Sequence, residues 1–307
     1  MGNTVSLVLG SGGARGLAHI GVIRELEARG FEIKSVTGCS MGALVGGLYC
    51  AGKLDTYADW VSNLQEWDVL KFLDISLTPR AGMMKGDLIM ERLRQMVGAR
   101  RIEDLPIPFS AVATDVAAKK EVWFNSGDLF DVIRASIAIP GLFTPKTING
   151  RTLVDGGLLN PLPSAPAMFT DTDITIAVSL SGLDVAEPYG DVNLRDYRTQ
   201  LETYREKIDD FLDQAQDRLG LELDKDDEAA EDEMPLTDIF LNMFDTMQRT
   251  IARYRLASYP PDILVEIPGN ICQTHEFYRA RPLIAAGHYW ARQALELHAD
   301  RISGRRD

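Results

Sequence analysis

The sequence predicts one large α/β domain with a mostly parallel sheet. The chain has 307 residues, 45% of them hydrophobic, and can therefore bury a large core. Two strand, glycine-rich turn and helix units follow one another over residues 4–29 and 33–52. Consecutive units of this kind favour parallel strands joined by right-handed crossovers.

The first unit has a β-rich run at residues 4–9, which stops at the cluster GSGGARG, and a helical pattern over residues 17–29. The second unit has a strand at residues 33–37 and the small-residue helix MGALVGGLYCAG, closed by Gly52. Further strands are expected at 109–114, 121–125, 146–154, 174–180 and 262–267, and further helices near 128–135, 236–257 and 276–300.

Acidic residues are concentrated in one segment. Residues 202–233 hold 14 acidic and 4 basic side chains. We therefore expect residues 183–235 to form an acidic, helical or mobile insertion in a single domain that spans residues 1–307. Residues 236–307 are expected to form a C-terminal helical part that packs on this domain.

The charge and the cysteines limit the partners and the location. The formal net charge is −13 and no basic stripe is present, which argues against a nucleic-acid partner. Three cysteines without CxxC spacing indicate reduced thiols, with neither a disulfide framework nor a zinc site. The N-terminus lacks the pattern of a signal peptide, so a cytoplasmic location is expected.

The glycine-rich turn at residues 10–16 is suited to holding an anion, because its backbone N–H groups lie beside a helix N-terminus. A dinucleotide fingerprint would require glycine where Arg15 stands, and a P-loop would require a lysine followed by serine or threonine. An oxyanion hole formed by the N–H groups of Gly12, Gly13 and Ala14 is the remaining interpretation. A tight turn without a ligand is the simpler alternative.

The stretch GCSMG is a G-x-S-x-G pattern at a strand-to-helix turn. In this context the flanking Gly38 and Gly42 permit a sharp turn that presents the hydroxyl of Ser40 at the carboxyl end of the sheet. The sequence therefore predicts that Ser40 is a nucleophile rather than a turn residue.

A nucleophilic serine requires a base. Asp155 in LVDGGLLNPLP ends a predicted strand and precedes two glycines, although D-G-G is also an ordinary turn sequence. His275 follows the last predicted strand, so the residues alone also permit a triad of Ser40, Asp155 and His275.

The segment at residues 66–90 is rich in large apolar side chains. These side chains either belong to the core or form a flexible cap that binds an acyl chain or a lipid surface. The side chains concerned are Trp67, Leu70, Phe72, Leu73, Met83 and Met84.

Four blocks together resemble the patatin-like phospholipase family, in its bacterial neuropathy-target-esterase branch. The blocks are GSGGARGLAHIGVIREL, GCSMGALVGGLYCAG, RASIAIPGLFTP and LVDGGLLNPLP, and they occur in the order of the family over about residues 4–180. The resemblance implies a three-layer α/β fold in which helices flank a mostly parallel central sheet.

The resemblance also implies a catalytic dyad without histidine, in which Ser40 is the nucleophile and Asp155 is the base. An oxyanion hole and two supporting turns are implied as well: the hole at Gly12, Gly13, Ala14 and Arg15, the nucleophile elbow at Gly38 and Gly42, and the aspartate loop at Gly156 and Gly157. The family commonly has three consecutive glycines in the first turn. This chain has Ser11 in the first of these positions, and the later N–H donors remain.

The implied activity is that of a serine lipid acyl hydrolase of the phospholipase A, lysophospholipase or carboxylesterase type. Its substrate would be a phospholipid, a lysophospholipid or another acyl ester, reached by peripheral contact with a membrane, and no cofactor or metal is called for. Three alternatives stay open: a thioesterase or acyltransferase of the same fold, a triad hydrolase that uses His275, and a lipid-binding regulator without enzymatic activity.

Overall fold

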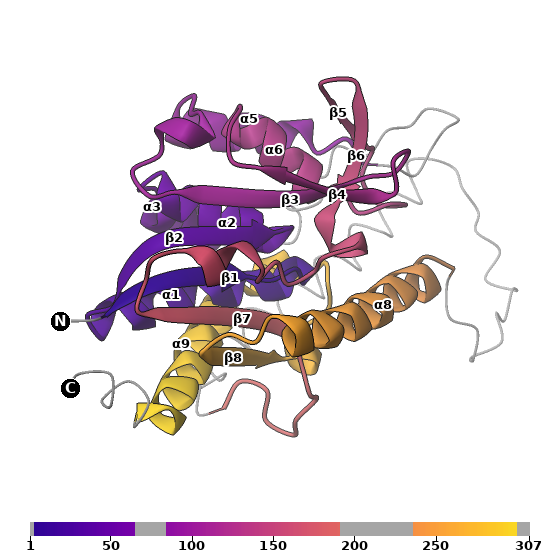
Figure 1. The fold of residues 1–307 in the computed structure, drawn as a ribbon. Helices are drawn as coiled ribbons and strands as arrows, with labels where there is room; N and C mark the ends of the chain where they lie inside the picture. Colours follow the sequence, from indigo (N-terminus) through magenta and orange to yellow (C-terminus); the bar gives the residue numbers. More distant parts are fainter. Residues whose placement is uncertain (1–2, 65–83, 191–235, 300–307) are drawn as a thin grey trace, which may run out of the picture.

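A computed structural model describes residues 3–64, 84–190 and 236–299 (Figure 1). Its strands form one mixed sheet in the order β5-β6-β3-β2-β1-β7-β8, with β4 paired to β3. The neighbours from β3 to β8 in this order are parallel, and β4, β5 and β6 pair antiparallel. The strands are β1 (Thr4–Leu9), β2 (Glu32–Cys39), β3 (Phe109–Asp115), β4 (Lys120–Phe124), β5 (Lys146–Ile148), β6 (Arg151–Asp155), β7 (Ile174–Gly182) and β8 (Ile263–Pro268).

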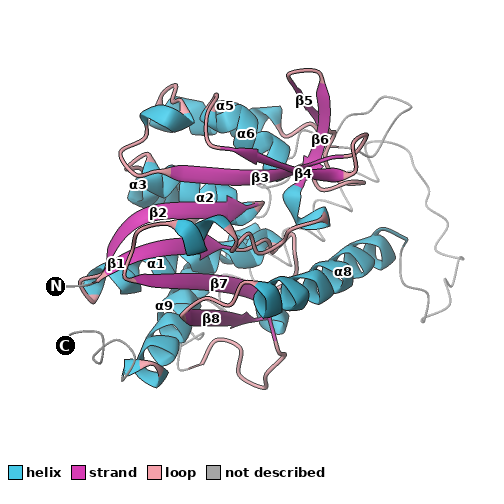
Figure 2. Cartoon of the chain, viewed as in Figure 1, coloured by secondary structure: helices cyan, strands magenta, loops and turns pink. Residues whose placement is uncertain are grey.

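Helices flank this sheet, so the predicted α/β class with a mostly parallel sheet is confirmed (Figure 2). The α-helices are α1 (Ala18–Ala28), α2 (Met41–Cys50), α3 (Leu54–Val61), α5 (Asp87–Val97), α6 (Leu129–Ser136), α8 (Leu236–Ser258) and α9 (Ala280–Leu297). Short 3-10 helices are η1 (Gly13–Leu17), η2 (Ile102–Asp104), η3 (Gly156–Leu158), η4 (Pro166–Phe169), η5 (Gly269–Ile271) and η6 (Phe277–Arg279). Helices α3 and α5 were not predicted.

The alternating side chains of β1 divide the core into two layers. Leu7 and Leu9 join the main hydrophobic core together with residues of α1, α2 and α9. Val8 points to the opposite face and belongs to a smaller cluster with Ala252 of α8. Figure 2 shows the same arrangement, with α8 in front of the sheet and α1 and α2 behind it. Three layers result.

Helix α9 lies against α1 at two glycines. A methyl group added to Gly21 would lie 1.9 Å from the carbonyl oxygen of Ile284, and one added to Gly287 would lie 2.0 Å from that of Ala18. The backbones of the two helices therefore approach closely, and helix α9 forms part of the core.

The predicted strand at residues 146–154 is wrong, because these residues form the hairpin of β5 and β6. Asn149 and Gly150 join the two strands, with φ of 50° and 75°. Asn-Gly is the dipeptide that best tolerates two consecutive positive φ angles in such a turn. The signal for the hairpin was therefore present in the sequence.

Part of the predicted acidic insertion, residues 191–235, lies outside the described residues. Among the described helices, none has both the length and the apolar character needed to cross a membrane.

Candidate active site

Ser40 occupies the sharp turn between β2 and α2. Its φ is 54°, a backbone conformation that residues other than glycine rarely adopt and that is common at functional sites. A methyl group on Gly38 would lie 2.4 Å from the carbonyl oxygen of Gly42, and one on Gly42 would lie 2.1 Å from that of Leu9. The turn therefore requires both glycines.

Ser136, at the end of α6, holds this turn from the side. The backbone N–H of Ser40 donates to Ser136 Oγ at 2.9 Å, and Ser136 Oγ donates to the carbonyl oxygen of Val112 at 2.6 Å. Ser136 is fully buried. It lies in the block RASIAIPGLFTP, but no local pattern in the sequence connects it with a turn 96 residues away.

Asp155, the last residue of β6, faces the hydroxyl of Ser40. Ser40 Oγ donates to Asp155 Oδ2 at 2.6 Å, and the N–H of Gly157 donates to Asp155 Oδ1 at 2.7 Å. Both side chains are removed from solvent, since Ser40 is 2% exposed and Asp155 is 0% exposed. The two residues that the sequence singled out are therefore brought into direct contact.

Burial raises the pKa of Asp155 from 3.8 to about 7. The hydrogen bonds from Ser40 and Gly157 favour the ionised form and partly oppose this shift. A carboxylate with a pKa near 7 is a much better proton acceptor than one in water, and it is substantially ionised at neutral pH.

Neither His275 nor His19 lies between Ser40 and Asp155, where the histidine of a catalytic triad would lie. His275 is exposed and lines the same cavity as Ser40, but the direct contact between Ser40 and Asp155 leaves no imidazole between them. His19 is fully buried and bonds the carbonyl oxygen of Gly10 through Nε2 at 2.9 Å. Burial lowers the pKa of His19 to about 4, so this side chain is neutral.

The glycine-rich turn runs beside Ser40, and Gly13 lines the same cavity. The φ of Gly13 is 56°, and a methyl group there would lie 2.3 Å from Thr274 Cγ2. Within the described residues, Gly12 and Gly13 are left as N–H donors without a protein partner. Three further N–H groups of this turn donate to carbonyl oxygens: Gly10 to Val178 at 3.0 Å, Ser11 to Pro161 at 2.8 Å and Ala14 to Thr274 at 2.8 Å.

The side chain of Arg15 is buried and ion-pairs with Asp245 of α8. Its Nε donates to the carbonyl oxygen of Gly12 at 3.1 Å and its Nη1 to that of Gly269 at 3.2 Å. In a trans peptide the C=O and the following N–H point in opposite directions. Arg15 therefore turns the N–H of Gly13 away from itself.

A cavity of about 270 Å³ opens in front of Ser40, with an almost entirely apolar lining. Tyr57 and Trp60 of α3 and Leu241 of α8 contribute to it, and the sequence did not single them out. The remaining lining residues are Gly13, Met41, Leu44, Val61, Leu64, Met84, Ile89, Ile137, Ile139, Leu142, Phe143, Thr274, His275 and Phe277.

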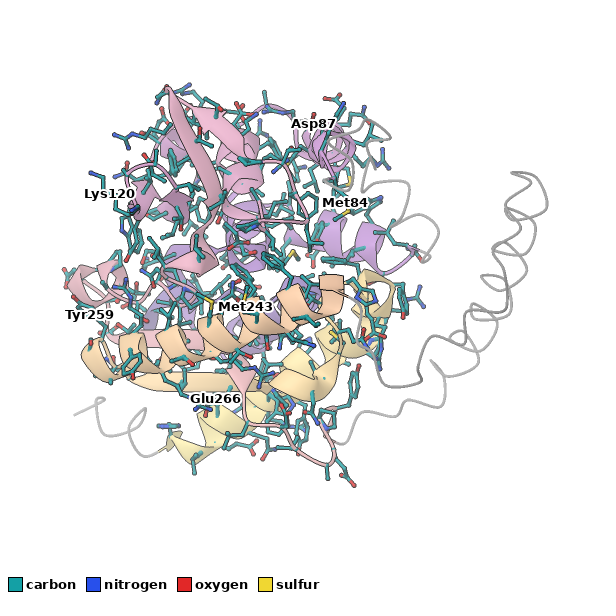
Figure 3. The ribbon with its side chains drawn as sticks, turned by 90° about the vertical axis from the view of Figure 1, so that its right-hand side faces the viewer. Met84, Asp87, Lys120, Met243, Tyr259 and Glu266 are labelled. Carbon is teal, nitrogen blue, oxygen red and sulfur yellow. The ribbon has the colours of Figure 1, made fainter. Side chains whose placement is uncertain are left out.

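The apolar segment at residues 66–90 contributes Met84 (Figure 3) and Ile89 to this cavity. The other large side chains predicted for the cap lie outside the described residues: Trp67, Leu70, Phe72, Leu73 and Met83. Across the described part of the chain, no group of three or more His, Cys, Asp or Glu side chains is placed to hold a metal ion.

Comparison with known proteins finds consistent similarities. The profile of the family described as patatin-like phospholipase matches residues 7–168. An uncharacterized NTE family protein of Mycobacterium tuberculosis is 41% identical over 329 aligned residues, which cover 95% of this chain and 91% of the relative. A protein of the same description from Mycobacterium bovis matches to the same extent.

Two weaker similarities are to a neuropathy target esterase and to a solved structure. A neuropathy target esterase of Drosophila persimilis is 35% identical over 169 residues, which cover 53% of this chain and 12% of that protein. The crystal structure of VipD from Legionella pneumophila gives a TM-score of 0.45 at 16% identity, covering 97% of this chain and 67% of VipD.

Proposed function

This chain belongs to the patatin-like phospholipase family, and from this premise we propose that it hydrolyses carboxylic ester bonds of lipids through an acyl-enzyme on Ser40. The observation that carries the proposal is the 2.6 Å hydrogen bond from Ser40 Oγ to Asp155 Oδ2 at the wall of an apolar cavity.

In the acylation step, Ser40 Oγ attacks the carbonyl carbon of the ester and its proton moves to Asp155 Oδ2. The pKa of about 7 makes Asp155 competent to take this proton and to return it to the leaving alcohol. The C–O bond to the alcohol breaks as the tetrahedral intermediate collapses, and the acyl group remains esterified to Ser40.

The negative oxygen of the tetrahedral intermediate needs hydrogen-bond donors that are already in place. Gly12 and Gly13 fit this role, because their N–H groups have no protein partner in the described structure and Gly13 lines the cavity beside Ser40. Ala14 does not, since its N–H donates to Thr274. The N-terminus of α2, which begins at Met41, adds a positive potential at Ser40.

In the deacylation step, a water molecule attacks the acyl carbonyl and gives its proton to Asp155. The intermediate collapses, Asp155 returns the proton to Ser40 Oγ, and the fatty acid is released. No histidine is needed in either step, because Asp155 contacts Ser40 directly.

The cavity favours a substrate with a hydrocarbon chain. Apolar side chains make up nearly all of its wall, so burial of an acyl chain there is stabilised by about 25 cal/mol for each Å² removed from water. A phospholipid, a lysophospholipid or another acyl ester satisfies this requirement.

The proposal is tested by the release of fatty acid from a lysophospholipid and from p-nitrophenyl esters of increasing chain length. We expect turnover by the wild type, higher kcat/KM for longer chains, and none above background for Ser40→Ala. Turnover of acyl thioesters alone, or transfer to an added alcohol in place of hydrolysis, would assign the site to a thioesterase or an acyltransferase. Binding of fatty acid without any turnover would indicate a lipid-binding protein.

A further inference from the structure

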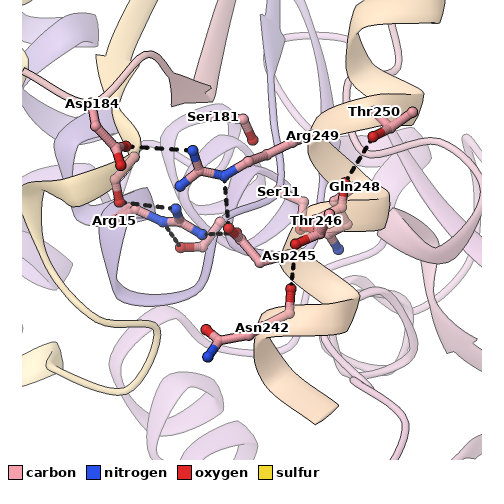
Figure 4. A network of polar contacts seen from close by, with 12 residues as sticks. Ser11, Arg15, Ser181, Asp184, Asn242, Asp245, Thr246, Gln248, Arg249 and Thr250 are labelled. Atoms are coloured by element: carbon pink, nitrogen blue, oxygen red, sulfur yellow. Dashed lines mark hydrogen bonds and ion pairs between the residues drawn. The ribbon is translucent and has the colours of Figure 1, made fainter. Parts of the chain in front are cut away.

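Helix α8 contacts the glycine-rich turn through polar side chains (Figure 4). It also contacts the aspartate loop at Gly157. It lies outside the part of the chain that the family profile matches, and it reaches the glycine-rich turn through two separate side chains. These side chains are Asp245 and Gln248, one turn apart on the same helix.

Asp245 acts on the glycine-rich turn through Arg15. One carboxylate oxygen pairs with Arg15, and the other accepts from Arg249 Nε at 2.7 Å. Burial alone would raise the pKa of Asp245, but the two guanidinium groups hold it below its usual value, so the carboxylate stays ionised. With its terminal nitrogen held in this way, Arg15 offers Nε to the carbonyl oxygen of Gly12.

Gln248 acts on the same turn through Ser11, the residue at which this chain departs from three consecutive glycines. Ser11 Oγ donates to Gln248 Oε1 at 3.2 Å, and both residues are buried, at 5% and 4% exposure. The amide nitrogen of Gln248 lies against the aspartate loop, where a methyl group on Gly157 would be 2.1 Å from Nε2. One side chain of α8 thus contacts the turns that carry the proposed oxyanion donors and the proposed base.

We propose that Asp245 and Gln248 are positioning residues that orient the N–H groups of Gly12 and Gly13 toward the transition state. Asp245 fixes the peptide between Gly12 and Gly13 through Arg15, and Gln248 fixes the start of the turn through Ser11. This inference rests on the proposed function, because the N–H groups that are positioned are those proposed to bind the oxyanion.

The test compares Asp245→Asn and Gln248→Leu with the wild type in two assays. One measures kcat and KM for a p-nitrophenyl ester, and the other measures the rate at which a fluorophosphonate modifies Ser40. Loss of a whole oxyanion donor lowers kcat by about 10²–10³. For misplaced donors we expect kcat and the modification rate to fall by about tenfold or more, with KM changed by less than about twofold.

Asp184→Asn is the matched control. Asp184 is exposed and contacts the far side of Arg249 at 3.4 Å, so the same substitution there removes a carboxylate from the network without touching Arg15. We expect its kinetics to equal those of the wild type. For Asp245→Asn and Asp184→Asn, the midpoint of the pH profile of kcat/KM is expected to stay at about 7, because both substitutions leave Asp155 its hydrogen bonds from Ser40 and Gly157.

Ser11→Ala, the smallest change, decides the outcome if Gln248→Leu does not fold, because it removes the same contact and is then expected to lower kcat by itself. Where both variants fold, a role through Ser11 predicts that the double variant Ser11→Ala/Gln248→Leu is no slower than the slower single variant. Folded variants with a lowered Tm but wild-type kcat would overturn the inference and leave α8 a purely structural element. A wild type that neither turns over the ester nor reacts with the fluorophosphonate would instead contradict the proposed function.

Discussion

The pKa of Asp155 is set by two opposing effects, burial that raises it and two hydrogen bonds that lower it. Burial has the larger effect, and the pKa of about 7 lies where the proposed base must change its protonation state. Because the unprotonated carboxylate is the active form, kcat/KM should rise with pH and level off above about 7. A pH profile of ester hydrolysis measures this, and a rate that is constant from pH 5 to 9 would assign the base elsewhere.

At the residue scale, the sequence was sufficient to propose which side chains carry the chemistry. The G-x-S-x-G pattern singled out Ser40 as a candidate nucleophile, and the family resemblance singled out Asp155 as its candidate base, since D-G-G alone is also an ordinary turn sequence. The contact between them could not be predicted, because it joins residues 115 positions apart through the pairing of β6 with β3. The assignment of Ser136, Asp245 and Gln248 required the tertiary structure for the same reason.

The turn that presents Ser40 depends on the hydrogen bond that its backbone N–H donates to Ser136 of the neighbouring helix α6. Ser136→Ala would leave the buried N–H of Ser40 without its acceptor, and an unsatisfied buried donor costs about 1–3 kcal/mol. We expect a loss of this size in the free energy of unfolding, measured with urea, together with reduced turnover.

Ser164→Ala is the control for this prediction. Ser164 is also buried, at 2% exposure, but its hydroxyl makes only a long bond of 3.4 Å to the carbonyl oxygen of Leu162. Equal losses of stability in the two variants would show that the contact with Ser40 has no special role.

The elements themselves were predicted unevenly. Strands β1, β2 and β7 and helices α2 and α8 follow from apolar runs and glycine boundaries, since these elements are buried or long. The hairpin of β5 and β6 was read as one strand because its two short arms form a single β-rich run around Asn149 and Gly150. Helix α3 is only eight residues long, too short for a clear periodic pattern.

At the scale of the whole molecule, the candidate site includes residues from beyond residue 168, where the match to the family profile ends. Helix α8 supplies Leu241 to the cavity and the polar contacts of the glycine-rich turn, and the segment before α9 supplies Thr274. Assembly of the site therefore requires the C-terminal part of the chain to dock on the sheet.

The contact of α9 with α1 gives a direct test of this dependence. Gly287→Val would place a side chain against the backbone of Ala18, which cannot move away as a flexible side chain could. Overpacking of this kind costs about 1–3 kcal/mol or more, so the free energy of unfolding and the turnover should fall together. Gln293→Val places the same side chain at an exposed position of α9. Valine has a lower helix propensity than glutamine but a higher one than glycine, so this control gives an upper limit for any propensity cost at Gly287. Equal effects of the two substitutions would mean that the close approach of the helices is not needed.

The central claim is that Ser40 is activated directly by Asp155. Intact mass after treatment with a long-chain fluorophosphonate tests it most directly, on the wild type, Ser40→Ala, Asp155→Asn and His275→Ala. We predict a single adduct on the wild type and on His275→Ala at equal rates, none on Ser40→Ala, and a rate lower by about 10²-fold or more on Asp155→Asn. Loss of the adduct in His275→Ala, with Asp155→Asn reacting as the wild type does, would contradict the account.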